Sequence, residues 1–291
     1  MNIQRVSDLP SPPVRPENSH KGTFGKVLII AGSSGMSGAA CLSGMGALRG
    51  GSGLVFLAIP ESIQSIVATV NPCYLTIPLQ SDQQGNLSES SKTHLFNQLH
   101  DFDAVAIGPG CGQHTWVQEV TLKLYTELKQ TLIVDADGLN AIATSGRPLP
   151  KAAGPRILTP HPGEFSRLIN LSTTEIAQHR EELSIAFAKQ HQVVLLLKGS
   201  HSLITDGTRI AVNTTGNSGL ATGGSGDVLT GLITSLAGQG LEAFEAAQLA
   251  AHLHGRAGDL AAQELSQPAL IASDLTDYLP EAWLELLQSQ N

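Results

Sequence analysis

The stretch NTTGNSGLATGGSGDVLTGLI, residues 213–233, contains six glycines and four threonines and becomes apolar directly after its single acidic residue, Asp227. Small residues leave backbone N–H groups uncovered just where the apolar pattern of a helix begins. Free N–H groups and the positive end of the helix dipole together form an anion site. We therefore predict an anion hole at the start of this helix. It comprises Gly223, Gly224, Ser225 and Gly226.

Asp227 falls in the first turn of that helix, where the helix dipole alone favours an acidic residue. Capping would explain one aspartate, but it would not explain the glycines around it, so we predict a chemical role for Asp227. The stretch is not a Walker A loop, because the G-x-x-x-x-G-K-[ST] spacing is absent. Nor does the chain carry a Rossmann fingerprint: Gly44, Gly46 and Gly50 have the wrong spacing and indicate close helix packing instead.

Outward from this stretch, short apolar runs alternate with helix-like segments, which predicts a mostly parallel, doubly wound sheet. Around Gly207, the sequences SLITD and RIAVN predict a hairpin and hence antiparallel edge strands. The apolar runs cover residues 25–32, 53–60, 102–110, 130–138, 154–164 and 192–200. The helix-like segments include 115–128 and 173–190, and most of the chain from Ser225 to about 263 and over 275–288.

Length and composition agree with a single α/β domain. The 291 residues are 41% hydrophobic but only 4% aromatic, so we expect an aliphatic core in which helices cover a parallel sheet. The first twenty residues carry four prolines and no apolar run. We therefore expect an N-terminal extension, residues 1–19, followed by one domain, residues 20–291.

Several functional classes are disfavoured. A net charge of −8 argues against nucleic-acid binding, which needs a basic face. No apolar run approaches the roughly 18 residues of a membrane span, and the N-terminal residues do not resemble a signal peptide. Cys41, Cys73 and Cys111 are odd in number and include no C-x-x-C pair, so neither a disulfide framework nor a zinc site is indicated. We expect a soluble, cytoplasmic protein.

Polar residues follow the ends of several predicted strands: Asp135 and Asp137 after one, His161 and Glu164 after the next, and Lys198 after another. Ligands of open α/β sheets bind beyond the carboxyl ends of the strands, so we expect these side chains to converge on one crevice. For the two aspartates, two interpretations remain open. They could form a paired-carboxylate metal site, or Asp135 alone could face the crevice while Asp137 caps the following helix.

Other polar residues point to packing. Cys111 has no identifiable partner base, so we interpret it as a small core residue. His252 and His254 lie two apart on a helix and face different directions, which indicates packing or a subunit contact rather than a shared metal.

Taken together, the motifs resemble those of a known protein family. G-S-G-D at the start of a late helix resembles the ribokinase-like superfamily. HKGTFGKVLIIAGS, AIGPGCG, VDADGLNAI, LTPHPGEFSRL, LLLKGSHSLITDG and AAHLHGRAGDLAA resemble the ADP-dependent NAD(P)H-hydrate dehydratase family from about His20 to the end of the chain. The resemblance implies a three-layer α/β/α fold of the ribokinase type. It also implies ADP-dependent conversion of the (6S)-hydrates of NADH and NADPH back to NADH and NADPH, with release of AMP and phosphate and with Mg²⁺ as cofactor.

The resemblance also implies residue roles. Asp227 would accept the proton of the hydrate hydroxyl, and the anion hole would hold the phosphoryl group in transfer. Glu164 would orient a magnesium-bound water, since Mg²⁺ keeps several waters, although an ordinary first-turn helix acid is a serious alternative for Glu164. The substrate contacts implied are Ala40, Gly110, His161 and Asp227. The nucleotide contacts implied are Lys198, Gly199, Ser200, His201, Ser202 and Gly226.

Two alternatives stand beside this hypothesis. One is a ribokinase-like kinase of a small vitamin-precursor alcohol, of the hydroxymethylpyrimidine or thiazole type, and the other is an ADP sensor without turnover. Family members are often homotetramers, so we expect a homotetramer. Some relatives carry an additional N-terminal domain that epimerises the hydrate, and we expect that activity to be supplied elsewhere.

Overall fold

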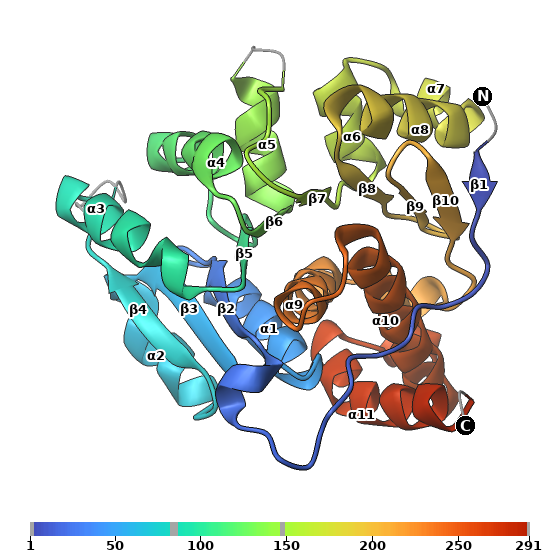
Figure 1. Cartoon of the computed structure of the whole chain (residues 1–291), viewed down its shortest axis with the longest axis horizontal. Helices are drawn as coiled ribbons and strands as arrows, with labels where there is room; N and C mark the ends of the chain where they lie inside the picture. Colours follow the sequence, from blue (N-terminus) through green and yellow to red (C-terminus); the bar gives the residue numbers. More distant parts are fainter. Residues whose placement is uncertain (1–2, 82–86, 146–148, 290–291) are drawn as a thin grey trace.

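A ten-stranded sheet runs through the part of the chain that the computed structural model describes, residues 3–81, 87–145 and 149–289 (Figure 1). The strands are β1 (Gln4–Arg5), β2 (Lys26–Ile30), β3 (Leu54–Pro60), β4 (Leu75–Leu79), β5 (Ala104–Ile107), β6 (Thr131–Val134), β7 (Arg156–Leu158), β8 (Val194–Leu197), β9 (Leu203–Thr205) and β10 (Arg209–Val212). The α-helices are α1 (Ser37–Arg49), α2 (Gln64–Val70), α3 (Glu89–Gln98), α4 (Thr115–Glu127), α5 (Ala136–Thr144), α6 (Pro162–Ile169), α7 (Thr173–Gln178), α8 (Arg180–His191), α9 (Ser225–Gly238), α10 (Ala243–Leu265) and α11 (Ala272–Ser289). Short 3₁₀ turns occupy Lys21–Phe24, Glu61–Ile63, Leu99–Asp101, Ser218–Leu220 and Gln267–Ala269.

The strand order across the sheet is β1-β10-β9-β8-β7-β6-β5-β2-β3-β4. Every pair from β8 to β4 is parallel, whereas β9 pairs antiparallel with both β8 and β10. This arrangement confirms the predicted mostly parallel sheet with antiparallel strands toward one edge. The N-terminal segment adds β1 outside β10 in parallel register.

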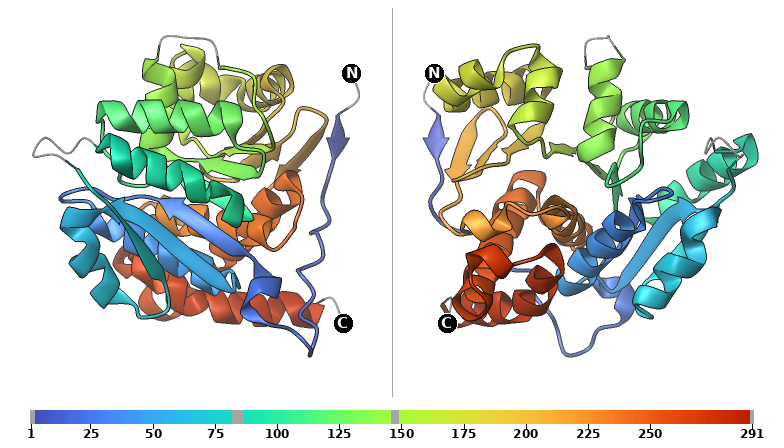
Figure 2. Two further views of the ribbon diagram at one scale, coloured as in Figure 1. Left: turned by 60° about the vertical axis from the view of Figure 1, so that its left-hand side comes forward. Right: turned by 180° about the vertical axis from the view of Figure 1, so that it is seen from behind.

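Helices cover both faces of the sheet, giving three layers. In β2, Val27 and Ile29 belong to the core shared with α1, α9, α10 and α11, and Leu28 and Ile30 belong to the core shared with α3, α4, α5, α6 and α8. Successive strand residues face opposite sides, so a strand buried on both faces must be continuously apolar. Figures 1 and 2 show α3–α8 on one side of the sheet and α1, α9, α10 and α11 on the other.

Helices α1 and α9 pack backbone to backbone. A Cβ added at Gly46 would lie 2.3 Å from the Val228 carbonyl oxygen, and one added at Gly231 would lie 1.9 Å from the Ser43 carbonyl oxygen. The glycines of α1 therefore serve close packing, as the sequence predicted. This contact fixes the position of α9, and with it the position of the glycine-rich stretch that opens α9.

Three elements differ from the sequence prediction. Strand β4 was missed because its short apolar run, LTIPL, is interrupted by Thr76 and by Pro78, a residue that sheets tolerate at their edges. Strand β1 was missed because it is only two residues long. The segment 173–190, predicted as one helix, forms two helices, α7 and α8. They are separated at His179, where the backbone leaves helical geometry (φ −125°, ψ 32°).

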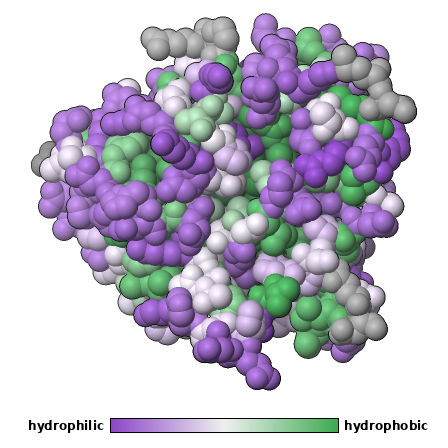
Figure 3. Space-filling view, in the orientation of Figure 1, coloured by the Kyte–Doolittle hydropathy of each residue, from purple (hydrophilic) through white to green (hydrophobic). Residues whose placement is uncertain are grey.

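Hydrophilic residues dominate the face seen in Figure 3, with apolar residues in small separate groups. Among the described residues, no helix is both long enough and apolar enough to cross a lipid bilayer.

Candidate active site

The glycine-rich stretch leads directly into α9, as the sequence predicted. Gly224 precedes the helix with φ +94°, a left-handed conformation suited to glycine, and no side chain caps the helix there. A Cβ added at Gly223 would meet no atom within 4 Å, so this position faces open space. In the first turn of α9, the N–H groups of Ser225 and Asp227 donate to the carbonyls of Thr222 and Gly224 at 3.4 and 3.0 Å, whereas no backbone group of the described residues accepts from Gly226. The Gly226 N–H group is thus available to an anion, and the positive end of the helix dipole favours negative charge there.

Asp227 lies in the first turn of α9 and is partly buried. Among the described residues its carboxylate has no hydrogen-bond partner, so it does not serve as a cap. Burial raises the pKa of Asp227 to about 7, repulsion by Asp135 and Asp137 adds to the rise, and the charge of Lys198 opposes it. A carboxylate that titrates near neutrality and has no partner is suited to accept a proton.

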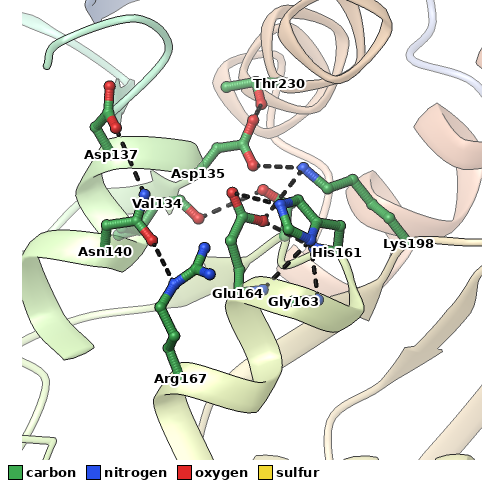
Figure 4. Close-up of polar contacts among 11 residues, drawn as sticks. Val134, Asp135, Asp137, Asn140, His161, Gly163, Glu164, Arg167, Lys198 and Thr230 are labelled. Atoms are coloured by element: carbon green, nitrogen blue, oxygen red, sulfur yellow. Dashed lines mark hydrogen bonds and ion pairs between the residues drawn. The ribbon is translucent and has the colours of Figure 1, made fainter. Parts of the chain in front are cut away.

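Lys198 directly follows β8, and its ammonium group lies next to the first turn of α9. Its Nζ lies 2.8 Å from Asp135 Oδ1 and 3.8 Å from Glu164 Oε2 (Figure 4). Thr230 of α9 donates to the other oxygen of Asp135 at 2.7 Å. A Cβ added at Gly226 would lie 3.3 Å from the same Nζ, so the ammonium group borders the predicted anion hole. Burial disfavours the charge on Lys198, but the attraction of Asp135 and Glu164 outweighs it and raises the lysine's pKa.

His161 and Glu164 form a reciprocal cap at the start of α6. His161 Nδ1 accepts from the backbone N–H of Gly163 and Glu164 at 3.0 and 3.3 Å, and Glu164 Oε2 accepts from the His161 backbone N–H at 2.8 Å. With Nδ1 an acceptor, the ring proton is assigned to Nε2. Because Pro162 starts the helix in a favourable geometry, the cap is rigid. Burial raises the pKa of Glu164, and the charge of Lys198 opposes that rise.

The predicted nucleotide segment, Lys198–Ser202, forms a loop after β8 in which Gly199, Ser200 and His201 are exposed and the two end residues are partly buried. Gly199 has φ +146°, and Ser202 Oγ donates to the Gly199 carbonyl at 3.1 Å. Arg180, at the start of α8, donates to the carbonyls of Leu197 and Ser200 at 2.9 and 2.8 Å. The sequence did not single out Arg180, and the break between α7 and α8 is what places it at this loop.

The remaining predicted residues lie in the segments that follow β2, β5 and β6: Ala40 in the first turn of α1, Gly110 in the loop after β5, and Asp137 in the first turn of α5. Gly110 has φ +61°, and a Cβ there would lie 2.7 Å from Ala39 Cβ. Ala40 is completely buried, whereas its neighbour Ala39 is partly exposed. Asp137 does not cap α5: its Oδ2 accepts from the backbone N–H of Gly112 at 2.8 Å, while Asp135 is the buried carboxylate that faces Lys198.

Two further residues are buried near the site, Cys111 in the loop after β5 and His254 on α10. Cys111 is fully buried and donates from Sγ to the Ile30 carbonyl at 3.4 Å, which confirms its place in the core. His254 of α10 is buried beneath the anion hole, with Nε2 2.9 Å from the Ser225 carbonyl oxygen and 3.2 Å from Ser225 Oγ. Burial lowers the pKa of His254 to about 4, so the ring is neutral at pH 7 and supports the first turn of α9. The sequence predicted packing or a subunit contact for His254, but it did not identify Ser225 as the partner.

No cluster of three or more His, Cys, Asp or Glu side chains within the described ranges could hold a metal ion. The two carboxylates nearest Lys198, those of Asp135 and Glu164, already accept hydrogen bonds from protein groups. These residues therefore fit a magnesium ion held mainly by phosphate oxygens and water, the mode that Mg²⁺ prefers. They do not fit a resident all-protein metal site.

An anion placed at the amino end of α9 would lie beside both Lys198 and Asp227, at the carboxyl ends of the parallel strands. Fold and site together define a protein of the ribokinase-like class. Within that class, residues 27–281 match the NAD(P)H-hydrate dehydratase family, and the chain belongs to that family.

Relatives and a solved structure agree with this assignment. The chain is 36% identical over 275 residues to the ADP-dependent (S)-NAD(P)H-hydrate dehydratase of Bacillus subtilis, covering 93% of each chain. The B. subtilis ADP/ATP-dependent NAD(P)H-hydrate dehydratase co-crystallised with ATP/Mg²⁺ superposes with a TM-score of 0.81, at 35% identity and 94% coverage of each chain. A bifunctional NAD(P)H-hydrate repair enzyme of Moorella thermoacetica is 43% identical over 270 residues, which are 92% of this chain and 51% of that one. The chain thus spans about half the length of this bifunctional relative.

Proposed function

We propose that this protein dehydrates the (6S)-hydrates of NADH and NADPH back to NADH and NADPH, consuming ADP and releasing AMP and phosphate. The observation that carries the proposal is Asp227, a partly buried carboxylate without a hydrogen-bond partner at the start of α9. Its pKa of about 7 lets it accept a proton at neutral pH. Family membership supplies the substrate class.

The chemistry balances in two steps. In the first, the hydroxyl oxygen of the hydrate attacks the β-phosphorus of ADP, AMP leaves, and Asp227 takes the hydroxyl proton. In the second, the electron pair of the ring nitrogen expels phosphate, and loss of a proton from the neighbouring ring carbon restores the dihydropyridine. Phosphorylation is needed because hydroxide is a poor leaving group and phosphate is a good one.

The residues of this chain position the groups. The N–H groups at the start of α9 and the Lys198 ammonium would hold the transferred phosphoryl group, because phosphoryl transfer depends mainly on positioning and charge stabilisation. The loop Gly199–Ser202, held by Arg180, would bind the remainder of the nucleotide. His161, whose ring is about half exposed, would face the hydrate. Ala40 would contribute only if its backbone becomes accessible.

Magnesium, bound through the phosphates and water, would neutralise phosphate charge. Glu164 is the nearest acidic candidate for orienting such a water. The homotetramer and the cytoplasmic location expected from the sequence remain predictions.

The test mixes purified protein with magnesium, chemically prepared NADH hydrate and either ADP or ATP. Return of the dihydronicotinamide absorbance together with release of one phosphate per turnover supports the proposal, and the comparison of nucleotides identifies the phosphate donor. If neither nucleotide restores absorbance although ADP binds, the proposal is wrong. A panel of small vitamin-precursor alcohols then tests the kinase alternative.

A further inference from the structure

A cavity of about 500 Å³ lies between α4, α5 and α6, next to the catalytic cluster but outside it. Its lining includes Gly112, Gln113, Asp137, Asn140, Thr144 and Arg167. The volume falls within the roughly 300–1,000 Å³ range of small-molecule sites. None of the roles assigned above uses this cavity.

The cavity borders the reaction centre through shared residues. Asp137 lines it and also raises the pKa of Asp227 by charge repulsion, so the same carboxylate is near both. Arg167 lies on α6 one turn beyond Glu164, on the same helix face. A Cβ added at Gly163 would lie 4.0 Å from Arg167 Nη1, which places the guanidinium beside the His161 cap.

The guanidinium of Arg167 uses only one of its three nitrogen atoms in a hydrogen bond within the described part of the chain. Its Nε donates to Asn140 Oδ1 at 3.0 Å, and in the described part of the chain its two Nη groups have no acceptor (Figure 4). The bond to Asn140 uses Nε and leaves both Nη groups without an acceptor among the described residues. A free arginine fork suits the paired oxygens of a phosphate. Next to Arg167 along the cavity wall, the side chains of Asn140 and Asp137 lie within 3.5 Å of each other, and their polar groups suit the hydroxyls of a ribose.

The strand order separates this cavity from the nucleotide loop. The loop Gly199–Ser202 follows β8, whereas the cavity lies beyond β5 and β6, with the β7 end and its His161–Glu164 cap between them. Asp227 of α9 lies close enough to Asp135, Asp137 and Lys198, which follow β6 and β8, to feel their charges. A nucleoside diphosphate at the β8 end and a second ligand at the β5–β6 end would therefore approach Asp227 from opposite sides.

We infer that this cavity binds the adenosine-phosphate half of the dinucleotide hydrate, the half that does not react, with Arg167 on a phosphate and Asp137 and Asn140 on a ribose. The inference rests on the proposed function, because that function makes the substrate a dinucleotide. Arg167 thereby determines preference for a dinucleotide over a mononucleotide. Binding energy gained there positions the nicotinamide ring without taking part in the chemistry.

The test measures kcat and KM for NADH hydrate, for the hydrate of reduced nicotinamide mononucleotide, and for ADP. We expect Arg167→Gln to raise KM for NADH hydrate by about tenfold, the factor that corresponds to about 1.4 kcal/mol. The values for the mononucleotide hydrate and for ADP should change by less than about twofold. Lys129→Gln removes one positive charge at the far end of α4 and is the matched control.

Thr144→Trp provides a second, independent variant, since Thr144 is an exposed residue that lines the cavity one to two helical turns beyond Asp137 and Asn140. It should fill the cavity and raise KM for NADH hydrate, while leaving the mononucleotide hydrate unaffected. Equilibrium dialysis of NADH against each variant gives a readout that does not depend on turnover, and the same loss of affinity is expected.

The outcomes are distinguishable. If the wild-type protein turns over NADH hydrate but both variants bind and convert it normally, the inference is wrong and the proposed function stands. If the variants raise KM for ADP instead, the cavity belongs to the nucleoside diphosphate and the inference is also wrong. If the wild-type protein does not turn over either hydrate with any nucleotide, the proposed function fails and the inference fails with it.

Discussion

Replacing Asp227 with asparagine should abolish turnover and at the same time stabilise the fold. The carboxyl has a pKa of 3.8 when free and about 7 in the folded protein, chiefly because it is buried. The folded protein therefore binds this proton more tightly than the unfolded chain does. The resulting destabilisation is absent below pH 3.8, grows as the pH rises, and is complete above pH 7.

The magnitude follows from the size of the shift. Each pKa unit corresponds to 1.36 kcal/mol, so the ionised carboxylate destabilises the folded state by at most about 4 kcal/mol above pH 7. Solvent contact at the partly buried group reduces this figure. We expect Asp227→Asn to raise the free energy of unfolding by about 2–4 kcal/mol at pH 8 and by about 1–2 kcal/mol at pH 5.

Thermal unfolding at several pH values measures this gain. At roughly 2 °C per kcal/mol for a chain of this size, Tm should rise by about 4–8 °C at pH 8 and by less than about 4 °C at pH 5. Asp277→Asn, at an exposed position on α11, is the control and should leave Tm unchanged. In the wild-type protein, kcat/KM should increase about tenfold per pH unit below pH 7 and level off above it. A variant that is less stable at pH 8, or equally stabilised at every pH, would refute the reasoning.

Three further substitutions test the site and its support. Lys198→Met should abolish activity and lower the free energy of unfolding by about 3 kcal/mol, because Asp135 is left buried without its cation. In a denaturant titration, this loss of stability should disappear when Asp135 is also changed to asparagine. Gly226→Ala places a methyl group 3.3 Å from Lys198 Nζ and should lower kcat/KM by about tenfold, or about 1.4 kcal/mol. Gly38→Ala, in open space at the start of α1, should leave activity near wild type. Arg156→Met should destabilise the fold by about 3 kcal/mol or more without changing kcat per folded molecule, because its guanidinium donates to several buried carbonyls at the end of α4. Equal losses for the two glycine variants would contradict the role of the Lys198 contact.

Much of the fold could be predicted from local pattern. The continuous apolar runs at β2, β5, β6 and β8 are typical of strands that helices cover on both faces, and the structure buries them on both faces. The Gly207 hairpin was also readable, because turn chemistry is local. Strand β4 was not, since edge strands carry a weaker pattern and its pairing with β3 is a long-range contact.

The candidate site shows the same contrast between features set by local sequence and features set by long-range contacts. The sequence indicated Asp227, Lys198, His161 and Glu164 because each directly follows a strand or opens a helix. It left Asp135 and Asp137 undecided, since their side chains point to partners far along the chain: Lys198 is 63 residues from Asp135, and Gly112 is 25 residues from Asp137.

By itself the sequence determined the layered α/β architecture, the glycine-rich start of α9 and the order of polar residues along the strand ends, because these depend on periodicity and on backbone freedom within a few residues. Only the tertiary structure decided which residues acquire a shifted pKa, a supporting contact or a place in a cavity. Burial and the charges of Asp135, Asp137 and Lys198 give Asp227 its raised pKa. His254 supports the first turn of α9 from another helix, and Arg167 faces a cavity made by three helices. A pKa, a supporting contact and a cavity all depend on distances between segments remote in sequence, and those distances exist only once the chain has packed.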